Sequence, residues 1–542
     1  MKSTVARLIV QFFKEAGVRH IFGVSGHSVF DITDALYGDA EIRFVAAMHE
    51  GPAAYMAAAY AKAKRGLAFC LASSGAGATN LLTGTAYAYK ESIPLIALSS
   101  EVRSREAGKG ASSWHEIPQR EMFEPVTKMS VTLTGECALD SMREAVRQAT
   151  TGRKGPIYIG IPRDVQNLEV TLPEPPWLPK PPLSPAPDSA AVERAAEDLK
   201  EAAAPVIIAG GGVYWARAEE ELKELAEIVG APFATTPSHK GLISEEHSLS
   251  LGVLGFGAFP FAGAFCLESD LVLAVGATFS EALTLGYGNK VIPEGARIVQ
   301  VDVDRREIGK IYPVRHAVVG DAKTILRELI NRSKGVERGK NSERLERLAR
   351  EKRSWREKLE ARGYGAEGPI DQWHVYGALK ETMGEETIVV GAGGTTELVR
   401  RFIAPAYVFH SGDFRAIGSG LATSIGLSLA FPGRPVACLT GDGSFMLETQ
   451  EMATAAACSL PISIIVIRNS AYGNMKRDQI RHWGGRVIGT DLHLPDLCTL
   501  AAAYGIEAQK VERPPELPTA IKRSLTLGRP CLLDVLCPIE GI

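Results

Sequence analysis

Short apolar runs alternate with longer amphipathic segments along most of the chain. Before Gly441 the run RPVACLT predicts a buried strand, residues 448–459 (ETQEMATAAACS) predict a helix, and PISIIVIR (461–468) predicts a second strand. Residues 191–331 show the same alternation, with strands at PVIIAGGG, APFATT, LVLAVGA and ARIVQVDVD and a helix over 219–229. Strands separated by helical segments are typical of parallel sheets.

Two segments without strand pattern divide the chain into three parts. Residues 167–190 are rich in proline, which neither a helix interior nor a central strand accommodates. Residues 332–368 are charged and helical in pattern. We therefore expect an α/β protein with three doubly wound parallel-sheet domains at 1–166, 191–331 and 369–542, joined by linkers at 167–190 and 332–368.

The first and last parts share a pattern. The segment LAFCLASSGAGATN…KESIPLIALSSE of the first part and PVACLTGDGSFMLE…ACSLPISIIVIRN of the last each contain a Cys-Leu strand, a glycine turn, a helix and a second strand after Pro. This pattern predicts a duplicated fold. The first copy has Ser74-Gly75 where the last has Asp442-Gly443, so only the last copy carries a carboxylate there.

Composition indicates a large globular enzyme. The 542 residues are 45% hydrophobic and 23% charged, and the formal net charge is −3, which gives no reason to expect nucleic acid or an anionic membrane as partner. The chain starts with an amphipathic pattern lacking a signal-peptide cleavage site, and no apolar run reaches membrane-span length. The eight scattered cysteines are typical of free thiols, so we expect a cytoplasmic protein.

The glycine turn after the strand at 434–440 carries the chemistry. Gly441-Asp442-Gly443 follows this strand, and Asn469 ends the next strand after 25 intervening residues (444–468). Both side chains should meet at the carboxyl edge of a parallel sheet, where ligands of such sheets bind, and we expect Asp442 to lie outside the core. Carboxylate and amide oxygens suit Mg²⁺, and glycines with a helix N-terminus suit a diphosphate. An ordinary Gly-Asp-Gly turn is the alternative.

The chain resembles the acetolactate synthase/pyruvate decarboxylase branch of the thiamine diphosphate (ThDP) enzymes. The matching stretches are GVRHIFGVSGHSVFDITDAL, the HE at 49–50, SSGAGATNLLTGTAYAYKESIPLIAL, FEPVTK, GPIYIGIPRDVQ, DAKTILREL and the GDG block. The resemblance implies pyrimidine-binding, middle and diphosphate-binding domains. It also implies a homo-oligomer, a dimer or tetramer, whose cofactors each lie between two chains.

The resemblance assigns roles residue by residue. Glu50 would be the activating glutamate, sharing a proton with the N1′ atom of the aminopyrimidine; the alternative is a glutamate that only stabilises a helix start. Mg²⁺ would be bound by Asp442, Asn469 and the Ala471 carbonyl. Ile417 would support the bent cofactor, with a core isoleucine as the alternative, and the Arg415 carbonyl would accept from its 4′-nitrogen. The other cofactor-binding positions are Gly394, Gly441, Gly443, Ser444, Tyr472 and Gly473.

The substrate side departs from the pattern of acetolactate synthases. Glu101 and Trp114-His115-Glu116 stand where these enzymes have Gln and Phe-Gln-Glu, and Gly26-His27 replaces two small residues. His27 and His115 are candidate proton donors or acceptors, although each could be only a surface residue; His49 could take part in catalysis or only pack. Thr278 replaces an arginine of the FAD-contacting motif, so FAD binding is doubtful.

These patterns favour one function with a stated alternative. We expect ThDP- and Mg²⁺-dependent cleavage of a 2-oxo acid or related ketone, with loss of CO₂ and transfer of the remaining unit to a second carbonyl. The alternative is a 2-oxo acid decarboxylase or a C–C lyase or hydrolase without carboligation. A non-catalytic relative is disfavoured because Glu50, Asp442 and Asn469 are all present.

Overall fold

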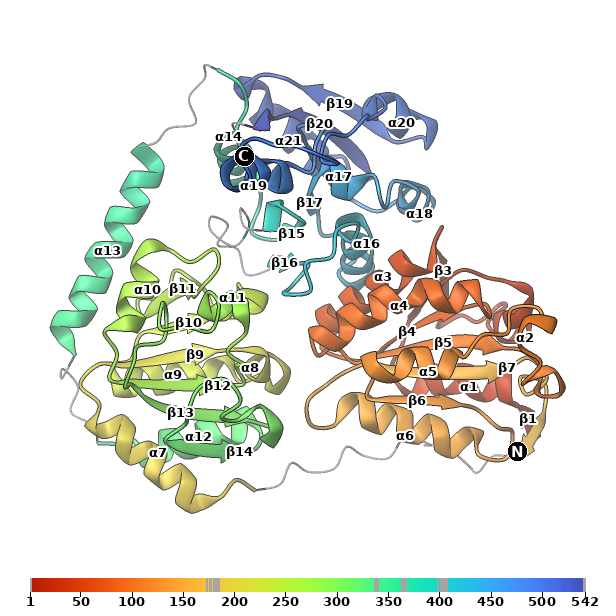
Figure 1. Cartoon of the computed structure of the whole chain (residues 1–542), viewed down its shortest axis with the longest axis horizontal. Helices are drawn as coiled ribbons and strands as arrows, with labels where there is room; N and C mark the ends of the chain where they lie inside the picture. Colours follow the sequence, from red (N-terminus) through yellow and green to blue (C-terminus); the bar gives the residue numbers. More distant parts are fainter. Residues whose placement is uncertain are drawn as a thin grey trace. The chain divides into compact units, whose positions relative to one another are not determined.

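The structure is a computed structural model that describes residues 2–171, 174, 178, 186–335, 341–361, 368–396, 399 and 408–539. It contains three six-stranded sheets flanked by helices (Figure 1), so the expected α/β class with three sheet domains is confirmed. Within the described residues, no helix has the length and apolar character needed to cross a membrane.

The N-terminal sheet has the strand order β3-β2-β4-β5-β7-β6. All its pairings are parallel. Its strands are β2 (His20–Gly23), β3 (Arg43–Ala46), β4 (Ala68–Ala72), β5 (Leu95–Glu101), β6 (Met129–Thr132) and β7 (Ile157–Pro162). Its helices are α1 (Val5–Glu15), α2 (Phe30–Ala35), α3 (Glu50–Lys64), α4 (Ala76–Lys90), α5 (Gln119–Phe123) and α6 (Ala138–Thr150).

The C-terminal sheet repeats this topology, with the order β16-β15-β17-β18-β20-β19. Its strands are β15 (Ile388–Ala392), β16 (Val408–His410), β17 (Val436–Gly441), β18 (Ile462–Arg468), β19 (Glu507–Val511) and β20 (Cys531–Leu536). Numbered within each sheet, both orders are 2-1-3-4-6-5, so the duplication expected from sequence is confirmed. The helices are α14 (Gln372–Thr382), α16 (Gly420–Ala430), α17 (Asp442–Phe445), α18 (Glu451–Ala457), α19 (Gly473–His482), α20 (Leu497–Ala503) and α21 (Leu517–Thr526).

The middle sheet has a different order, β11-β10-β9-β12-β13-β14, which numbers 3-2-1-4-5-6 and is the doubly wound order of dinucleotide-binding folds. Its strands are β9 (Pro205–Ala209), β10 (Phe233–Thr235), β11 (Ser250–Val253), β12 (Leu271–Val275), β13 (Arg297–Asp302) and β14 (His316–Val319). Its helices are α7 (Ser189–Glu201), α8 (Gly211–Ala216), α9 (Glu219–Val229), α10 (Pro260–Leu267), α11 (Glu281–Thr284) and α12 (Ala322–Arg332). The predicted helix over 219–229 is confirmed, whereas β11 and β14 were not predicted.

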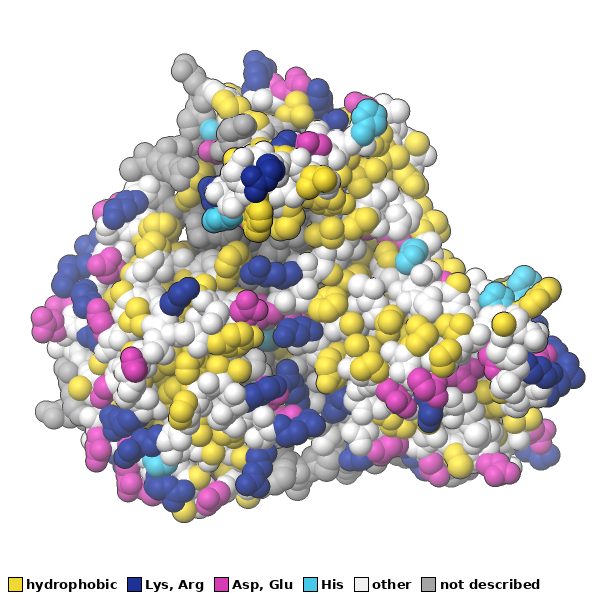
Figure 2. Space-filling model, in the orientation of Figure 1, with side chains coloured by type: hydrophobic (Ala, Val, Ile, Leu, Met, Phe, Trp, Pro, Cys, Tyr) yellow, Lys and Arg dark blue, Asp and Glu magenta, His cyan; other side chains and the backbone are white. Residues whose placement is uncertain are grey.

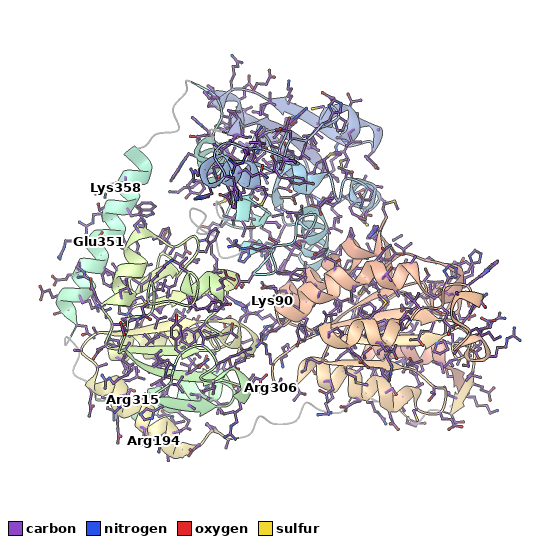
Figure 3. All side chains as sticks on the ribbon, in the orientation of Figure 1. Lys90, Arg194, Arg306, Arg315, Glu351 and Lys358 are labelled. Atoms are coloured by element: carbon purple, nitrogen blue, oxygen red, sulfur yellow. The ribbon has the colours of Figure 1, made fainter. Side chains whose placement is uncertain are left out.

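The two predicted linkers differ in structure. Residues of the proline-rich segment at Glu169–Thr171 form strand β8, which pairs antiparallel with β1 (Lys2–Thr4), and most of the remainder lies outside the described residues. The charged segment contains helix α13 (Ser342–Ala361), as its pattern predicted. Exposed Glu351 and Lys358 project from this helix (Figure 3).

Helix α1 illustrates how the pattern builds the core. The Thr4 hydroxyl caps its N-terminus by accepting from the Arg7 N–H, and the apolar positions form one buried face under the N-terminal sheet. In the middle domain the Asp198 carboxylate binds two arginines from other segments, Arg297 at 3.2 Å and Arg315 at 2.8 Å. Figure 3 labels Arg315. Figure 2 shows basic and acidic side chains interspersed over the visible face.

Candidate active site

Strands β17 and β18 position the predicted metal ligands. The strands are parallel neighbours with Gly441 opposite Ile467, so Asp442 and Asn469 follow at the same edge. Oδ2 of Asp442 accepts from the backbone N–H groups of Asn469 at 2.8 Å and Ser470 at 2.6 Å, and Oδ1 accepts from Gly443 N–H at 2.8 Å. Asp442 and Asn469 therefore lie at one sheet edge, as predicted, and their joint binding of a metal ion stays a prediction.

The helix after the glycine turn differs from the prediction. Helix α17 begins at Asp442 itself and has four residues, and α18 begins only at Glu451. Asp442 is 1% exposed, so the expectation that it lies outside the core is wrong. Burial raises the pKa of its carboxyl group, and the three backbone N–H donors oppose that rise.

The donor set at this edge suits Mg²⁺. The Asn469 Oδ1 atom lies 3.0 Å from Ala471 N–H and thus faces the same turn as the Ala471 backbone. An antiparallel bridge between Ala471 and Asp491 fixes this turn. Its two bonds run from Tyr472 N–H to the Thr490 carbonyl and from Leu492 N–H to the Ser470 carbonyl, so neither uses the Ala471 carbonyl. Carboxylate, amide and carbonyl oxygens are hard ligands, so the residues fit the ion.

The two glycines beside Asp442 differ in their surroundings, and only Gly441 has open space next to it. A Cβ at Gly441 would meet no atom within 4 Å, whereas a Cβ at Gly443 would lie 2.7 Å from the Tyr472 ring. The ring therefore packs directly on the backbone at Gly443, and Gly473 begins helix α19 in the next position. This open backbone beside a buried carboxylate fits a metal-bound diphosphate.

A turn before α16 carries the residues expected beneath the cofactor. Arg415 has φ 54°, a left-handed conformation that is uncommon for side-chain-bearing residues and often occurs at functional sites. The Ser444 hydroxyl accepts from Gly418 N–H at 3.0 Å and joins this turn to α17. Ile417 is 43% exposed, so it does not lie in the core of this chain. Its contact with the cofactor stays a prediction.

Gly394 lies in the turn directly after β15, next to Gly393, whose φ is 59°. The Thr395 hydroxyl accepts from Ala392 N–H at 3.0 Å and fixes this turn. Gly394 is exposed at the strand end. Its position agrees with the expected one, and its contact with a cofactor stays a prediction.

Glu50 is the first residue of helix α3 and is 8% exposed. The His49 Nδ1 atom caps the helix by accepting from Gly51 N–H at 3.0 Å, so His49 has a structural role. The Asn80 amide donates to Glu50 Oε2 at 2.9 Å. A Cβ at Gly77 would lie 3.1 Å from Glu50 Oε1, so glycine there leaves space for the carboxylate. Sequence reasoning missed Asn80 and Gly77, although both lie in the quoted stretch SSGAGATN.

The turn between β4 and α4, residues 73–75, contacts the segments that carry the two candidate histidines. Next to His27, the Ser28 hydroxyl accepts from Ser74 N–H at 3.1 Å. The His115 backbone packs on Gly75, where a Cβ would lie 2.9 Å from the His115 carbonyl oxygen. Both imidazoles are exposed, and their part in the reaction stays a prediction.

Gln119 is a buried support of this turn that sequence reasoning missed. Its Oε1 atom accepts from Gly75 N–H at 2.7 Å, and its Nε2 atom lies 2.8 Å from the Tyr158 hydroxyl and 2.9 Å from the Ser100 carbonyl oxygen. An isolated Gln after Pro offers no sequence signal for this role. The side chain fixes the Gly75 backbone, which precedes α4.

Glu101 ends β5 at the same edge. Burial raises the pKa of its carboxyl group, and the Thr132 hydroxyl, which donates to Oε1 at 3.1 Å, opposes the rise. A Cβ at Gly160 would lie 1.9 Å from that oxygen, so the neighbouring strand makes room for the side chain. Position 101 thus brings an acidic group to the carboxyl end of β5.

The triple-glycine turn of the middle domain packs against protein. A Cβ at Gly210 would lie 2.3 Å from the Gly276 carbonyl oxygen, and one at Gly212 would lie 2.6 Å from the Gly276 Cα. These glycines therefore allow two turns to touch. Thr278 lies in the turn after Gly276 and supplies no cation for a flavin, so the expectation that FAD is doubtful stays a prediction.

Comparisons with known proteins cover all three domains. The chain matches the models for the thiamine pyrophosphate enzyme N-terminal TPP binding domain over residues 3–125, the central domain over 192–329 and the C-terminal TPP binding domain over 391–535.

Similar proteins extend over nearly the full chain. A probable acetolactate synthase large subunit of Methanocaldococcus jannaschii is 33% identical, with 99% of this chain and 92% of that protein covered. The acetolactate synthase large subunit of Corynebacterium glutamicum is 32% identical over 99% of this chain and 87% of its own. The acetolactate synthase isozyme 1 large subunit of Escherichia coli is 30% identical, with 99% of this chain and 94% of that protein covered. The chain therefore belongs to the thiamine pyrophosphate enzymes, as an acetolactate synthase-like member of that family.

Proposed function

We propose that this enzyme uses ThDP and Mg²⁺ to cleave a 2-oxo acid with loss of CO₂ and to join the remaining unit to a second 2-oxo acid or ketone. The proposal rests on the sheet edge where buried Asp442 meets Asn469, found in a chain whose three domains all match thiamine pyrophosphate enzymes. The similarity to acetolactate synthase large subunits supports carboligation as the second half of the reaction.

Asp442, Asn469 and the Ala471 carbonyl would hold Mg²⁺. Because Asp442 is buried and its pKa is raised, a divalent cation beside it compensates the cost of a buried carboxylate. The Gly441 and Gly443 backbone, Ser444, Tyr472 and Gly473 would surround the diphosphate, with Gly394 at the end of β15. Ile417 and the Arg415 carbonyl would bind the cofactor's ring system.

Glu50 would hold a proton at its Oε1 atom. Oε2 accepts from Asn80, and Oε1 lies beside the space that Gly77 leaves. ThDP, when bound, supplies a carbon nucleophile and an electron sink. Glu50 would exchange its proton with the N1′ atom, and Asn80 would keep the carboxylate oriented for that exchange.

A decarboxylase without carboligation is the second candidate. His27 and His115 are exposed and lie in segments that contact the turn at 73–75, and imidazole groups can protonate an intermediate near neutral pH. Glu101 adds a half-buried carboxyl group with a raised pKa on the same side. Protonation by such a group would yield an aldehyde.

We further propose that the active unit is a homo-oligomer, at least a dimer. The activating glutamate belongs to the N-terminal domain and the metal ligands belong to the C-terminal domain. In the family that the chain resembles, these two domains of different chains face one another across the cofactor. Two equivalent sites would then form across an isologous interface.

The test is product identification. Purified enzyme is incubated with ThDP, Mg²⁺ and a panel of 2-oxo acids singly and in pairs, and products are identified by mass. A branched 2-hydroxy-3-oxo acid supports carboligation. An aldehyde as sole product supports the second candidate, and no product with any acid, together with undetectable ThDP binding, contradicts both.

A further inference from the structure

The contact between helices α3 and α16 joins the N-terminal and C-terminal domains within one chain. A Cβ at Gly426 would lie 2.2 Å from the Met56 carbonyl oxygen, so the two helix backbones touch at this point. Nearby, the Met48 N–H donates to the Glu451 carboxylate at 3.2 Å. Helix α3 begins at Glu50, and α16 follows the turn that carries Ile417. This contact therefore joins two helices that, in the proposed oligomer, each lead into a different cofactor site.

Glu448 lies at this contact and is fully buried. Its Oε2 atom accepts from Ala422 N–H at 3.0 Å, and the N–H groups of Gly420 and Leu421 also donate to the carboxylate. These are the first residues of α16, so Glu448 accepts from the N–H groups that have no partner within that helix. The Ile417 turn is thereby fixed to the segment 442–448 at two points, Ser444 and Glu448.

Two buried polar atoms at the contact lack a partner among the described residues. One is Glu448 Oε1, and the other is the hydroxyl oxygen of Tyr55, a residue of α3 that is 3% exposed. Burial and, to a smaller extent, the charge of Glu448 raise the pKa of Tyr55, so the two groups influence one another. Unsatisfied buried polar groups are costly, and native proteins rarely keep two in one place.

We propose that one buried water molecule joins the Tyr55 hydroxyl and Glu448 by hydrogen bonds and makes both of them positioning residues for Glu50 and Ile417. A water molecule can donate to a carboxylate or accept from a carboxylic acid, so it satisfies both atoms in either protonation state. The role in cofactor positioning rests on the proposed function, whereas the hydrogen bonds themselves do not.

The pair also makes the contact sensitive to pH. Burial, with a contribution from the Glu451 charge, raises the pKa of Glu448 to about 7, while the N–H groups of α16 oppose the rise. The titratable groups around it are Glu451 on α18, Tyr55 on α3 and Cys438 on β17. Because the folded pKa is raised, the stability from Glu448 is full below its ordinary pKa and is lost as pH rises through about 7.

The first test detects the hydrogen bond without cofactor or substrate. Difference infrared spectra of the full-length protein are recorded while pH is changed across neutrality. The carboxylic C=O band that disappears in Glu448→Gln is assigned to Glu448. We expect Tyr55→Phe to shift that band and its titration midpoint, and the control Tyr60→Phe, on the same helix, to leave both unchanged. A band unaffected by Tyr55→Phe would overturn the pairing.

The second test measures positioning. Loss of one hydrogen bond is worth about 0.5–1.5 kcal/mol, so Tyr55→Phe should weaken ThDP binding roughly two- to tenfold. Glu448→Gln keeps an acceptor for α16 and a donor for Tyr55, but its side chain cannot titrate. Unlike the wild-type protein, this variant should therefore bind ThDP with the same affinity at pH 6 and at pH 8, about one unit below and above the Glu448 pKa of about 7. An unchanged pH profile in Glu448→Gln would contradict the role. If wild-type protein bound no ThDP, the proposed function would fail while the infrared result still stood.

Discussion

Replacing Asp442 by asparagine should abolish Mg²⁺-dependent ThDP binding and also destabilise the turn. The carboxylate accepts from three backbone N–H groups, those of Gly443, Asn469 and Ser470. An asparagine has one acceptor oxygen, so its amide nitrogen must face at least one of these donors. Hydrogen bonds to a charged acceptor contribute about 1.5–3 kcal/mol and neutral ones about 0.5–1.5 kcal/mol. At mid-range values, one lost bond (about 2.25 kcal/mol) and two weakened bonds (about 1.25 kcal/mol each) give a destabilisation of about 5 kcal/mol.

Loss of the charge should weaken cofactor binding further. Groups that only support a metal ligand typically contribute 10- to 100-fold to metal affinity, so a direct ligand should contribute at least about 100-fold. The assay is calorimetry of ThDP titrated into the variant with and without Mg²⁺, after circular dichroism has confirmed that it is folded.

A matched control is Asp496→Asn, which alters an exposed carboxylate that caps α20 by accepting from Thr499 N–H at 2.7 Å. This variant should keep wild-type ThDP affinity, because the Asp496 carboxylate caps a helix and is not one of the proposed metal ligands. Wild-type affinity in Asp442→Asn would refute the metal assignment. Equal losses in both variants would show that the effect is a general loss of stability.

Three further outcomes are expected. Glu50→Gln should bind ThDP with an affinity within a few-fold of wild type, measured by calorimetry, and lose roughly 10²–10⁴ in turnover, because proton-transfer groups contribute that much; unchanged turnover would make Glu50 a structural residue. Because Thr278 replaces an arginine, the purified protein should show no flavin absorbance; a flavin spectrum near one per chain would contradict this. Mixing inactive Glu50→Gln and Asp442→Ala proteins under subunit exchange should restore one intact site per mixed dimer. No recovery despite demonstrated exchange would place both residues in one chain's site.

Local patterns predicted much of the fold because strands and glycine turns depend on neighbouring residues. The strands flanking Asp442 and the helix at 219–229 have strong periodicity, and both are present. Strands β11 and β14 are four residues each and are paired at sheet edges, so their short patterns resemble loops. Strand β8 has three residues and lies at the start of the segment 167–190, which its proline content marked as a linker.

Contacts between side chains were predictable only where both residues belong to one sequence motif. Asp442 and Asn469 meet because two adjacent parallel strands end together, which spacing can predict. Asn80, Gln119 and Glu448 act through contacts between segments far apart in sequence, and no local pattern encodes those. The burial of Asp442 was missed for the same reason, since it depends on how the turn 469–472 covers the carboxylate.

The stoichiometry of CO₂ release tests the central claim most directly. Wild-type enzyme with ThDP and Mg²⁺ is given a carboxyl-labelled 2-oxo acid, and CO₂ release, remaining acid and ligated product are measured in the same reaction. Carboligation predicts two molecules of 2-oxo acid consumed for each CO₂ released, with one ligated product and no turnover when Mg²⁺ is chelated. One acid consumed per CO₂ with an aldehyde as product, or turnover independent of ThDP, would contradict the account.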